Sequence, residues 1–593
     1  MLPFAGMAQN AEVLFSANGG FYEDVFELEM FSTAPQGRIF YTTNGNRPTV
    51  QSQLYTEPIL LDTSMYSKSD IYTIQISPDD LVFVPDSVQH CIVIRAAVFD
   101  EHDNCISEVK TNSYFIRALG CNTHDLPVVS LCADSLDLFD YERGIMVPGA
   151  WYDPLDPNWS GNYYQSGREW ERWANVEFYE LDNTGINQQA GVRTHGGNGR
   201  RFQQKALKIY AREEYGKKRF KHEFFETIPN NNFKRLVLKP FASSWNDSGV
   251  NDHICNQIAA QLDVESLASR PVLMFLNGEY WGIYYIHEKP DERYLEDHFD
   301  VDIEKVNIIS GWNPIVDYGS VDNFEALIEW VEQNDLTEPA AWDYFTNQID
   351  INNFIDYQIL ELFIENNDWP ANNMRCWQVD DGKWRWIFYD GDACLNWMTY
   401  NAFDNSIYVG DSYWPSSTRS TLFFRKLLEN DAFKETFIDR FDQLLGTVFQ
   451  YSVTEPFFED VKAKIEPEIP FQVERFGIPN DLSKWTEAMG NLQWFLMKRA
   501  VMIVERINEF MNIPELLSGR CYPNPSSGEI HLCIETHSFM GVEICIYDMM
   551  GRKVFAQQCL FATGENRVTI NPQLPSGIYF LKVGTLTQKI ICY

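Results

Sequence analysis

Apolar and polar residues alternate in short runs over the first part of this chain. From Glu12 to about Ile116 these runs are separated by turn signals such as Asn18-Gly19-Gly20 and Asn44-Gly45. Period-two alternation broken by Gly, Asn and Pro is typical of strands joined by tight turns. The same pattern returns after Arg520 and continues to the last residue. We therefore predict an all-β region at each end of the chain, with a different architecture between them.

The middle of the chain mixes strand and helix patterns. A hairpin is predicted between Arg270 and Glu288, with its turn at Asn277-Gly278. Apolar residues at helical spacing predict a series of helices. These cover about 250–262, 423–428, 433–449 and 486–511. The expected fold class is multidomain, with an N-terminal β-sandwich, a central α+β domain and a C-terminal β-sandwich.

The segment from Glu361 to Asn396 has the most informative local pattern. A helical apolar pattern ends in a polar loop, where Pro370 prevents further helix. Two strand-like runs follow, Met374 to Val379 and Trp384 to Tyr389, and Asp380-Asp381-Gly382 joins them as a tight hairpin. The carboxylates before and after this hairpin are therefore expected at its two edges, among four tryptophans.

Three residues of this segment have the order that phosphoryl transfer needs. Asp368 and Asn373 are spaced as D-x-x-x-x-N, and Asp390 lies at the end of the second strand. One carboxylate can accept a hydroxyl proton, while an amide and a second carboxylate hold metal on the phosphates. The alternative is a solvated loop with Asx turns beside an acidic hairpin edge, which is common in so acidic a chain.

A glycine-rich turn with arginines precedes a strand with two lysines. The turn runs from Gly191 to Arg201 and includes Arg200, and its backbone N–H groups and guanidinium groups can bind phosphate. In the following strand, alternation places Lys205 on the face of the apolar residues and Lys208 on the other face. A lysine on an apolar face either extends to solvent or pairs with a buried group. Lys205 is therefore the preferred phosphate ligand, and Lys208 is the second choice.

Composition limits the classes of partner. The chain has 593 residues, 45% hydrophobic and 15% aromatic, which is enough for several packed domains. A formal net charge of −37 argues against nucleic acid and anionic membranes as partners. There is no apolar run long enough for a membrane span. The twelve cysteines include no C-x-x-C pair, so no zinc or thioredoxin motif is indicated. Those after Arg520 either pair in an oxidising compartment or remain buried thiols.

The first residues are expected to stand apart from the folded regions. Residues 1–11 have no basic segment and too short an apolar run for a complete signal peptide, so we interpret them as a residual signal or disordered segment. The predicted domains are 12–118, 125–512 and 519–593.

The N-terminal region resembles a known accessory module. Gly37 to Pro48 contains Tyr-Thr-Thr-Asn-Gly followed by Pro, and Tyr55 to Ile59 and Ile94 to Phe99 fit the same pattern. These runs are similar to the chitobiase C-terminal-like β-sandwich that accompanies many extracellular glycosidases. The resemblance implies a structural module or a weak glycan-binding accessory.

The central region resembles the CotH family of spore-coat-type (spore coat protein H) atypical protein kinases. The resemblance rests on five motifs in order and covers roughly Pro127 to Asn512. They are the Gly/Arg turn with its lysine strand, the strand–Asn-Asp–helix unit at 236–258, the hairpin LNGEYWGIYYIHE at 276–288, Asn367-Asp368 with Asn373, and the run from Trp386 to Asp392.

The CotH resemblance implies a two-lobed, kinase-like fold that binds ATP and Mg²⁺ and phosphorylates serine on a protein. Transferred residue by residue, it implies that Asp368 is the catalytic base and that Asn373, Asp390 and Asp392 are metal ligands. It also implies that Lys205 binds the nucleotide, and Arg200 and Glu288 complete the predicted nucleotide contacts. Gly391 departs from the family pattern, because a bulkier apolar residue is expected there.

The last region resembles the type IX secretion sorting domain of Bacteroidetes. Its motifs are Cys521-Tyr-Pro-Asn-Pro525, the run Ile546 to Val554 around Gly551, and Leu574 to Val583 around Gly577. The resemblance implies export by the type IX machinery and a secreted or surface-attached protein.

Three functional hypotheses follow. The first is a secreted, CotH-like kinase that transfers the γ-phosphate of ATP to a protein hydroxyl with Mg²⁺. The second is a catalytically degenerate, kinase-like surface protein with a role in adhesion or glycan binding. The third is a carbohydrate-active enzyme that uses two carboxylates, such as Asp368 with Asp390 or Glu288. Hydrolase signatures such as H-E-x-x-H and G-x-S-x-G are absent from the sequence.

Overall fold

The N-terminal region folds as short β-strands, as the alternating pattern predicts. The computed structural model describes residues 11–67, 70–78, 81–120, 125–244, 247–311, 315–396, 402–411, 414–511, 517–536, 540–584 and 586–592, so nearly all of the predicted segment 1–11 lies outside it. One sheet has the order β2-β9-β8-β5-β6, and β1 pairs with β4 and β3 with β7. The bounds are β1 Val13–Phe15, β2 Gly20–Tyr22, β3 Glu27–Leu28, β4 Met30–Ser32, β5 Arg38–Thr42, β6 Gln53–Leu54, β7 Ile59–Leu60, β8 Ile92–Phe99 and β9 Lys110–Ile116.

The strands that follow close into a barrel of order β10-β11-β12-β13-β16-β18-β17. The first and last strands of this order, β10 and β17, pair with each other in parallel and so close the barrel. All other neighbouring strands are antiparallel. Alternate residues such as Leu131, Leu207 and Met274 fill the interior. The predicted turn Asn277-Gly278 is confirmed, with positive φ at both residues as a tight hairpin requires. The bounds are β10 Val128–Ala133, β11 Arg172–Tyr179, β12 Gly185–His195, β13 Ala206–Tyr210, β16 Arg235–Pro240, β17 Ser269–Leu276 and β18 Glu279–His287, with β14 Phe220–Lys221 and β15 Asn232–Phe233 as a separate pair.

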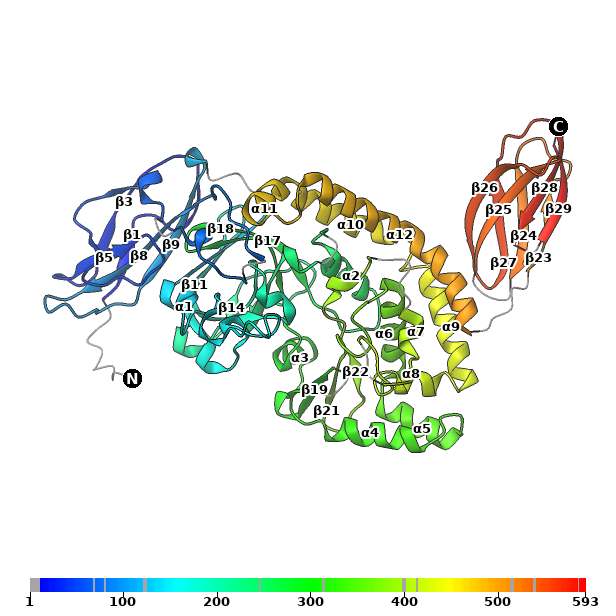
Figure 1. Cartoon of the computed structure of the whole chain (residues 1–593), viewed down its shortest axis with the longest axis horizontal. Helices are drawn as coiled ribbons and strands as arrows, with labels where there is room; N and C mark the ends of the chain where they lie inside the picture. Colours follow the sequence, from blue (N-terminus) through cyan, green and yellow to red (C-terminus); the bar gives the residue numbers. More distant parts are fainter. Residues whose placement is uncertain are drawn as a thin grey trace. The chain divides into compact units, whose positions relative to one another are not determined.

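A second group of elements combines helices with a sheet of order β20-β19-β21-β22 (Figure 1). The predicted helix before the polar loop is α6, and the predicted hairpin is β21–β22, with a shorter second strand than expected. The bounds are α2 Asn251–Ala259, α3 Glu292–Phe299, β19 Val306–Ser310, β20 Ile315–Tyr318, α4 Asp322–Gln333, α5 Pro339–Gln348, α6 Ile351–Ile364, β21 Arg375–Val379, β22 Arg385–Trp386, α7 Ala402–Ser406, α8 Leu422–Leu427 and α9 Asp431–Leu445. The short helix α1, Ser135–Phe139, lies earlier, after β10.

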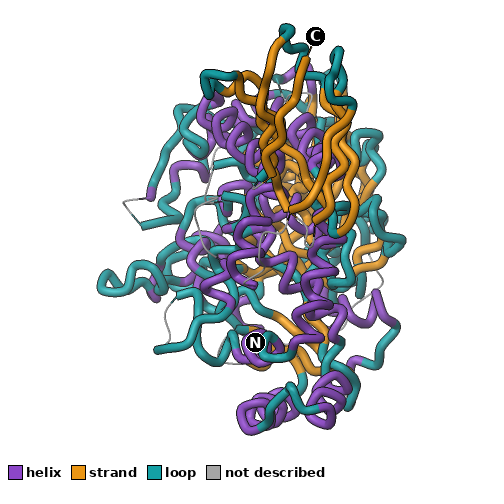
Figure 2. The backbone as a smooth tube through the Cα atoms, turned by 90° about the vertical axis from the view of Figure 1, so that its right-hand side faces the viewer, coloured by secondary structure: helices purple, strands orange, loops and turns teal. Residues whose placement is uncertain are grey.

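The last part of the chain has three helices and then a region rich in strands, drawn orange near the C-terminus in Figure 2. The strands form two sheets, β23-β24-β27 and β26-β25-β28-β29. The bounds are α10 Tyr451–Ile465, α11 Ile469–Phe476, α12 Leu482–Met511, β23 Leu517–Tyr522, β24 Ile530–Thr536, β25 Met540–Asp548, β26 Lys553–Phe561, β27 Gly564–Ile570, β28 Gly577–Val583 and β29 Leu586–Cys592. None of the helices described here combines the length and apolar character needed to cross a membrane.

The chain divides into two compact units. The first comprises residues 1–250, 267–289 and 460–488, and the second comprises 251–266, 290–459 and 489–593. The first unit thus contains the N-terminal strands and the barrel, whereas the second contains α6, the β21–β22 hairpin and the C-terminal strands. The protein is multidomain and mixes helix and sheet, as predicted.

A buried glutamate joins the N-terminal sheet to the barrel within the first unit. Glu177 of β11 accepts hydrogen bonds from the Ser113 backbone N–H at 3.1 Å, the Ser113 hydroxyl at 2.5 Å and the Tyr179 hydroxyl at 2.5 Å. Ser113 belongs to β9, so the carboxyl group links two sheets. Burial raises the pKa of Glu177 to about 7. The carboxyl group is therefore partly protonated near neutral pH.

We predict that Glu177 makes the first unit less stable as pH rises. Its pKa is higher in the folded protein than the usual value of about 4.5, so folding favours the protonated form, and stability is lost as pH rises through 7. Between pH 6 and 8 the expected loss is roughly 1 kcal/mol. Thermal unfolding of Glu177→Gln should show a correspondingly smaller pH dependence than wild type. Equal slopes for the two proteins would contradict this account.

Candidate functional site

The loop after α6 is held by two buried polar residues that precede Asp368. α6 ends at Ile364, and Glu365 adopts a left-handed conformation with φ of 56°. The Asn366 side-chain oxygen accepts the Asp368 backbone N–H at 3.0 Å, while its amide group donates to Glu361 at 2.8 Å. Glu361 is fully buried, and burial raises its pKa to about 8. The end of α6 therefore determines the position of Asp368.

Three of the predicted site residues lie together in the second unit. The Asn373 side-chain amide donates a hydrogen bond to the Asp390 backbone carbonyl at 3.1 Å. Both residues have positive φ, 48° and 64°, a conformation that Asn and Asp tolerate better than most residues. Burial raises the pKa of the Asp368 carboxyl to about 6, and the negative charge of Asp390 adds to this rise. Asp390 is thus close enough to affect the ionisation of Asp368.

Helix α2 holds the loop that follows Asp390. Its Asp252 side chain accepts the Gly391 backbone N–H at 2.7 Å, and the Asn251 amide donates to the Cys394 carbonyl at 2.5 Å. Asp392, the other predicted metal ligand, is partly exposed in the short helical turn Gly391–Ala393. The sequence pattern does not single out Asp252 as a site residue. Its one recognisable feature is that it is an acidic residue in the first turn of a helix. This feature does not predict a contact with a loop much later in the chain.

The departure at Gly391 has a structural reason. A Cβ atom at this position would lie 3.0 Å from the Cys255 Cβ, 3.1 Å from the Phe388 ring and 3.3 Å from the Asp252 Cα. Two of these atoms belong to α2, so a side chain at 391 would require the helix or the loop to shift by a few tenths of an ångström. Glycine at 391 therefore permits the contacts that Asp252 makes.

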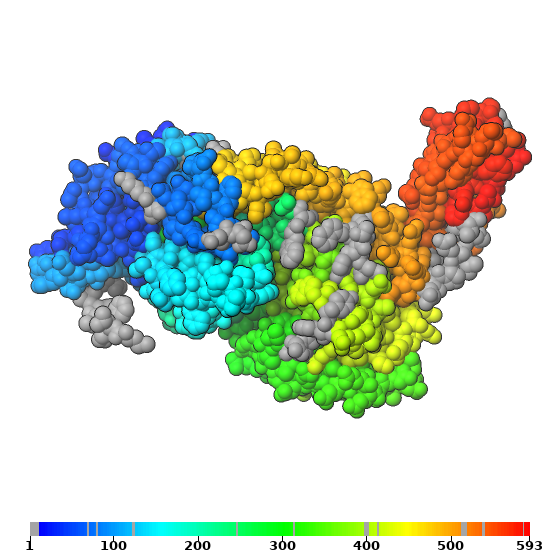
Figure 3. All heavy atoms as spheres, in the orientation of Figure 1, coloured from blue at the N-terminus to red at the C-terminus, as the bar shows by residue number. Residues whose placement is uncertain are grey.

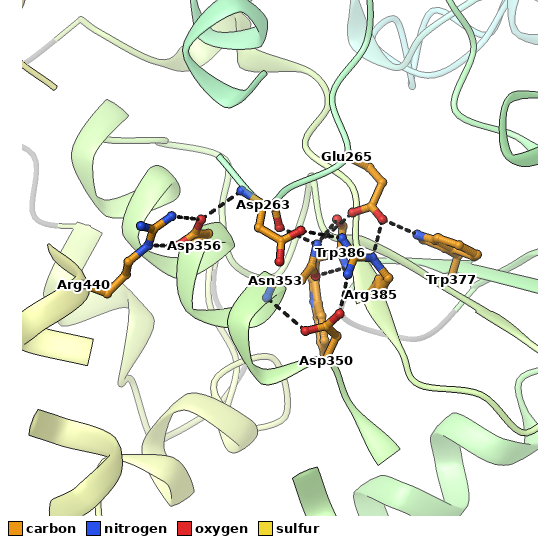
Figure 4. Close-up of polar contacts among 9 residues, drawn as sticks. All are labelled: Asp263, Glu265, Asp350, Asn353, Asp356, Trp377, Arg385, Trp386 and Arg440. Carbon is orange, nitrogen blue, oxygen red and sulfur yellow. Dashed lines mark hydrogen bonds and ion pairs between the residues drawn. The ribbon is translucent and has the colours of Figure 1, made fainter. Parts of the chain in front are cut away.

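An ion network around Arg385 connects the elements that lead to the site (Figure 4). The Arg385 guanidinium donates to Glu265 at 2.6 Å and to Asp263 at 2.8 Å, and it also pairs with Asp350. The buried Glu265 receives a further hydrogen bond from the Asn353 amide at 2.8 Å. Burial raises the pKa of Glu265, while Arg385 opposes this rise. We call Asp263, Glu265, Asp350 and Arg385 the Arg385 network.

The other predicted site residues lie in the first unit. Lys205 is fully buried, and its ammonium group donates to the carbonyls of Ile76 at 2.7 Å and Phe202 at 2.6 Å. The Arg200 guanidinium donates to the Gly196 carbonyl of its own loop at 2.5 Å and to the Tyr164 carbonyl of an earlier segment at 3.1 Å. The Glu288 carboxylate accepts the Ala268 backbone N–H at 3.0 Å. Alternation along the strand predicts Lys205 on the face next to the barrel core, and the residue lies there. Its ammonium group, however, donates its hydrogen bonds to protein carbonyls.

A group of partly buried cations lies near His195 in the first unit. Burial lowers the pKa of His195, and positive charges nearby lower it further. Those charges belong to Lys208, Arg200, Lys289 and Lys239. We call these four residues and His195 the basic face. Lys208 alternates with Leu207 and Ile209, whose side chains enter the barrel core, so Lys208 is on the outer side of β13. Arg200 lies in the turn before this strand, and Lys289 follows β18.

Two kinds of chemistry are therefore available in the described residues. The second unit presents hard oxygen donors at Asn373, Asp390 and Asp392, although no cluster of three or more His, Cys, Asp or Glu residues suited to a metal occurs in the described part of the chain. Mg²⁺ typically uses only one or two carboxylates together with substrate phosphates, so such a cluster is not required. The basic face of the first unit has the charge and hydrogen-bond donors that phosphate needs.

We predict that the Arg385 network is essential for the stability of the second unit. Arg385→Ala leaves the buried Glu265 carboxylate without its cation, which costs about 3–5 kcal/mol. Urea unfolding followed by tryptophan fluorescence measures this loss. Lys383→Ala, on the exposed part of the same hairpin, is the matched control and should change stability by less than about 0.5 kcal/mol. Similar midpoints for both variants would show that the network contributes little.

Comparison with known proteins gives three family matches. Residues 192–503 match the model described as CotH kinase protein, residues 520–592 match the secretion system C-terminal sorting domain, and residues 17–76 match the chitobiase/beta-hexosaminidase C-terminal domain. The three resemblances predicted from the sequence are thus confirmed. The sorting domain indicates secretion or an outer-surface location and implies the type IX secretion machinery as a partner.

The other comparisons add little. No curated protein matches the chain. Among solved structures, dimeric latent PorU from Porphyromonas gingivalis is similar at 18% identity and a TM-score of 0.13, covering 13% of this chain and 9% of that chain. The CotH match, in contrast, spans more than half of the 593 residues. The chain therefore belongs to the CotH kinase protein family.

Proposed function

We propose that this protein is a secreted or surface-attached CotH-like kinase that transfers the γ-phosphate of ATP to a hydroxyl group of a protein, with Mg²⁺. In this proposal the barrel is the nucleotide-binding lobe of a kinase-like fold, and the helical part of the second unit is its catalytic lobe. The observation that carries the proposal is the convergence of Asp368, Asn373 and Asp390. These are the residue types that phosphoryl transfer needs for a base and a metal.

Asp368 is the proposed proton acceptor. Its carboxyl group is partly buried and has a pKa of about 6. At neutral pH most molecules therefore carry the carboxylate, and the pKa is close enough to this pH for the group to exchange a proton. A base with a pKa near the working pH is the most effective proton acceptor. Asn366 and Glu361 act as positioning residues, because they hold the loop from which Asp368 projects.

Asn373 and Asp390 would hold Mg²⁺, with Asp392 as a further carboxylate. Amide and carboxylate oxygens are the donors that this hard cation prefers, so the residues present fit it. When bound, Mg²⁺ would neutralise charge on the transferred phosphate. Asp252 is a positioning residue for Asp390, because its hydrogen bond to the Gly391 N–H holds the next peptide in the chain.

The basic face supplies the proposed phosphate contacts. Lys208, the second choice from the sequence, belongs to it, as does the predicted Arg200. The phosphate role predicted for Lys205 stays a prediction, but two carbonyls already occupy its ammonium group in a fully buried position. Glu288 sits at the end of β18, next to Lys289 of the basic face, where a carboxylate can orient a lysine.

We predict that Mg²⁺-ATP raises the thermal stability of the wild-type protein. A ligand that binds only the folded state, at ten times its Kd, adds about 1.4 kcal/mol. Asp390→Ala should abolish the shift because it removes a metal ligand, and Lys208→Ala should lower the apparent affinity at least about tenfold because it removes a phosphate contact. Differential scanning fluorimetry over a nucleotide titration measures both effects.

Matched controls separate binding from folding in this titration. Asp411→Ala and Lys217→Ala remove exposed charges and should retain the wild-type shift. Lys205→Ala should lower the melting temperature without nucleotide, because two buried carbonyls lose their donor. Absence of any shift for wild type at millimolar Mg²⁺-ATP would reject nucleotide binding.

We predict that phosphate transfer depends on the ionisation of Asp368. Because only the carboxylate accepts a proton, kcat/KM should fall about tenfold per pH unit below pH 6. Asp368→Asn should lower transfer by about 10²–10⁴-fold while leaving the Mg²⁺-ATP melting shift in place. Transfer of radiolabelled phosphate to a protein acceptor provides the measurement. A flat profile down to pH 5 would remove Asp368 from this role.

The alternative is a catalytically degenerate surface protein with an adhesion or glycan-binding role. One observation favours it: Tyr141, Trp151 and Trp159 are 65%, 57% and 59% exposed in a single irregular segment of the first unit. This segment lies in the cyan part of the surface in Figure 3. Exposed aromatic rings offer flat apolar faces for ligands. Binding of Mg²⁺-ATP without any transfer to protein would favour this alternative over the kinase.

A further inference from the structure

We propose that a cavity beside the Asp368 loop binds a short, uncharged side chain of the acceptor protein, one that both donates and accepts a hydrogen bond. This inference rests on the proposed kinase function, because it assigns the cavity to a residue near the hydroxyl group that receives the phosphate. The cavity lies within the second unit and has a volume of about 40 Å³. That is the space of roughly three water molecules, or of a short side chain.

The loop that carries the proposed base and metal ligand forms one wall of the cavity. Trp369 lines the cavity and directly follows Asp368, and Met374 lines it and directly follows Asn373. Consecutive Cα atoms are only about 3.8 Å apart, so a group bound in the cavity lies near both site residues. The cavity is therefore well placed for a residue that neighbours the reacting hydroxyl in an acceptor chain.

Most of the cavity wall is aromatic or aliphatic. Helix α6 contributes Phe354, Tyr357 and Gln358, which share one face of the helix at i, i+3 and i+4 spacing. Side chains of α4, β22 and α8 complete the apolar wall: Phe324, Ile328, Trp386, Phe423 and Phe424. In such surroundings a hydrogen bond is stronger than in water, so a few polar atoms decide which ligand binds.

Two of the residues that line the cavity have a buried polar atom without a hydrogen-bond partner in the described part of the chain. They are the side-chain oxygen of Gln358, a residue only 5% exposed, and the Nε of Arg419. The amide oxygen accepts a hydrogen bond, and the guanidinium N–H donates one. A buried polar atom without a partner is costly, so a ligand gains affinity when it supplies both a donor and an acceptor.

The charges around the cavity favour a neutral ligand. The Arg419 guanidinium pairs with Glu325, and the other described residues that line the cavity carry no charge. A charged ligand would lose its hydration without gaining an unpaired opposite charge. Met374, Arg419 and Ser420 are partly exposed, so a side chain can enter from their side. Threonine and asparagine meet these requirements, whereas valine lacks the polar group and aspartate is charged.

Fluorine NMR of the full-length protein tests the cavity without any phosphate transfer. Trp369 and Trp386 line it, so 5-fluorotryptophan at these positions reports binding, and Trp369→Phe and Trp386→Phe assign the two signals. The N-acetyl amides of threonine and asparagine should shift both signals saturably. Those of valine and aspartate should bind at least about tenfold more weakly. No saturable shift with any of the four would mean a cavity for water only and would overturn the proposal, as would tighter binding of valine.

Variants of the two polar residues test which atoms recognise the ligand. Gln358→Leu removes an unpartnered oxygen from an apolar wall, so the protein should fold and should prefer valine to threonine. Arg419→Lys keeps a positive charge for Glu325 but lacks the Nε–H, so it should weaken binding of threonine and asparagine alike. Asn352→Leu, on the exposed part of α6, is the matched control and should keep the wild-type order. A wild-type order in Gln358→Leu would overturn the proposal.

Serine-centred peptides separate this inference from the kinase function itself. With radiolabelled ATP and Mg²⁺, threonine or asparagine at one position near the serine should be preferred to valine or aspartate at least about tenfold, and Gln358→Leu should remove this preference. Transfer at equal rates to all peptides would retain the kinase and overturn the subsite. Saturable NMR shifts without transfer to any peptide would reject the kinase and the acceptor role together, and would retain the cavity only as a binding pocket.

Discussion

The Arg385 network is the interaction on which the candidate site depends. One guanidinium group pairs with carboxylates from the segment after α2 and from the residue that precedes α6, and Arg385 itself lies on β22. Each of these elements continues to a site residue: α2 begins beside Asp252, α6 leads to Asp368, and β22 leads to Asp390. Because a buried carboxylate without a cation is costly, the three elements are fixed to one another and not merely packed. The geometry of the site follows from this shared anchor.

Local patterns predicted the parts of the fold that depend on neighbouring residues. The helix before Asp368 and the β21–β22 hairpin follow from apolar spacing, Pro370 and the Asp-Gly turn, and both are present. Closure of the barrel was not predicted, because it depends on the parallel pairing of β10 with β17, which are separated by more than a hundred residues. The spacing of apolar residues within a strand does not indicate which distant strand it pairs with. The convergence of Asp368 with Asp390 was predictable because one hairpin connects them.

Lys205 shows what the alternation of apolar and polar residues along a strand can and cannot predict. Its face was predicted correctly, since Leu207 and Ile209 do line the barrel core. Alternation predicts the face of the strand on which a lysine lies, but it does not predict which groups accept hydrogen bonds from a buried ammonium group. Here the carbonyl of Ile76, from a loop far earlier in the chain, supplies one acceptor. A buried lysine that is satisfied by protein carbonyls gains little from a ligand, whereas the lysines of the basic face are only partly buried.

The local charge around the candidate residues differs from the charge of the chain as a whole. With a net charge of −37, the chain as a whole repels anions such as nucleotides. Against this background, His195 of the barrel lies near four cationic side chains, and burial together with these charges lowers its pKa. In the second unit, burial and then the negative charge of Asp390 raise the pKa of the Asp368 carboxyl to about 6. Amide and carboxylate oxygens of this unit are the donors that a hard divalent cation prefers, and a cation bound beside Asp368 would lower the cost of ionising this carboxyl group.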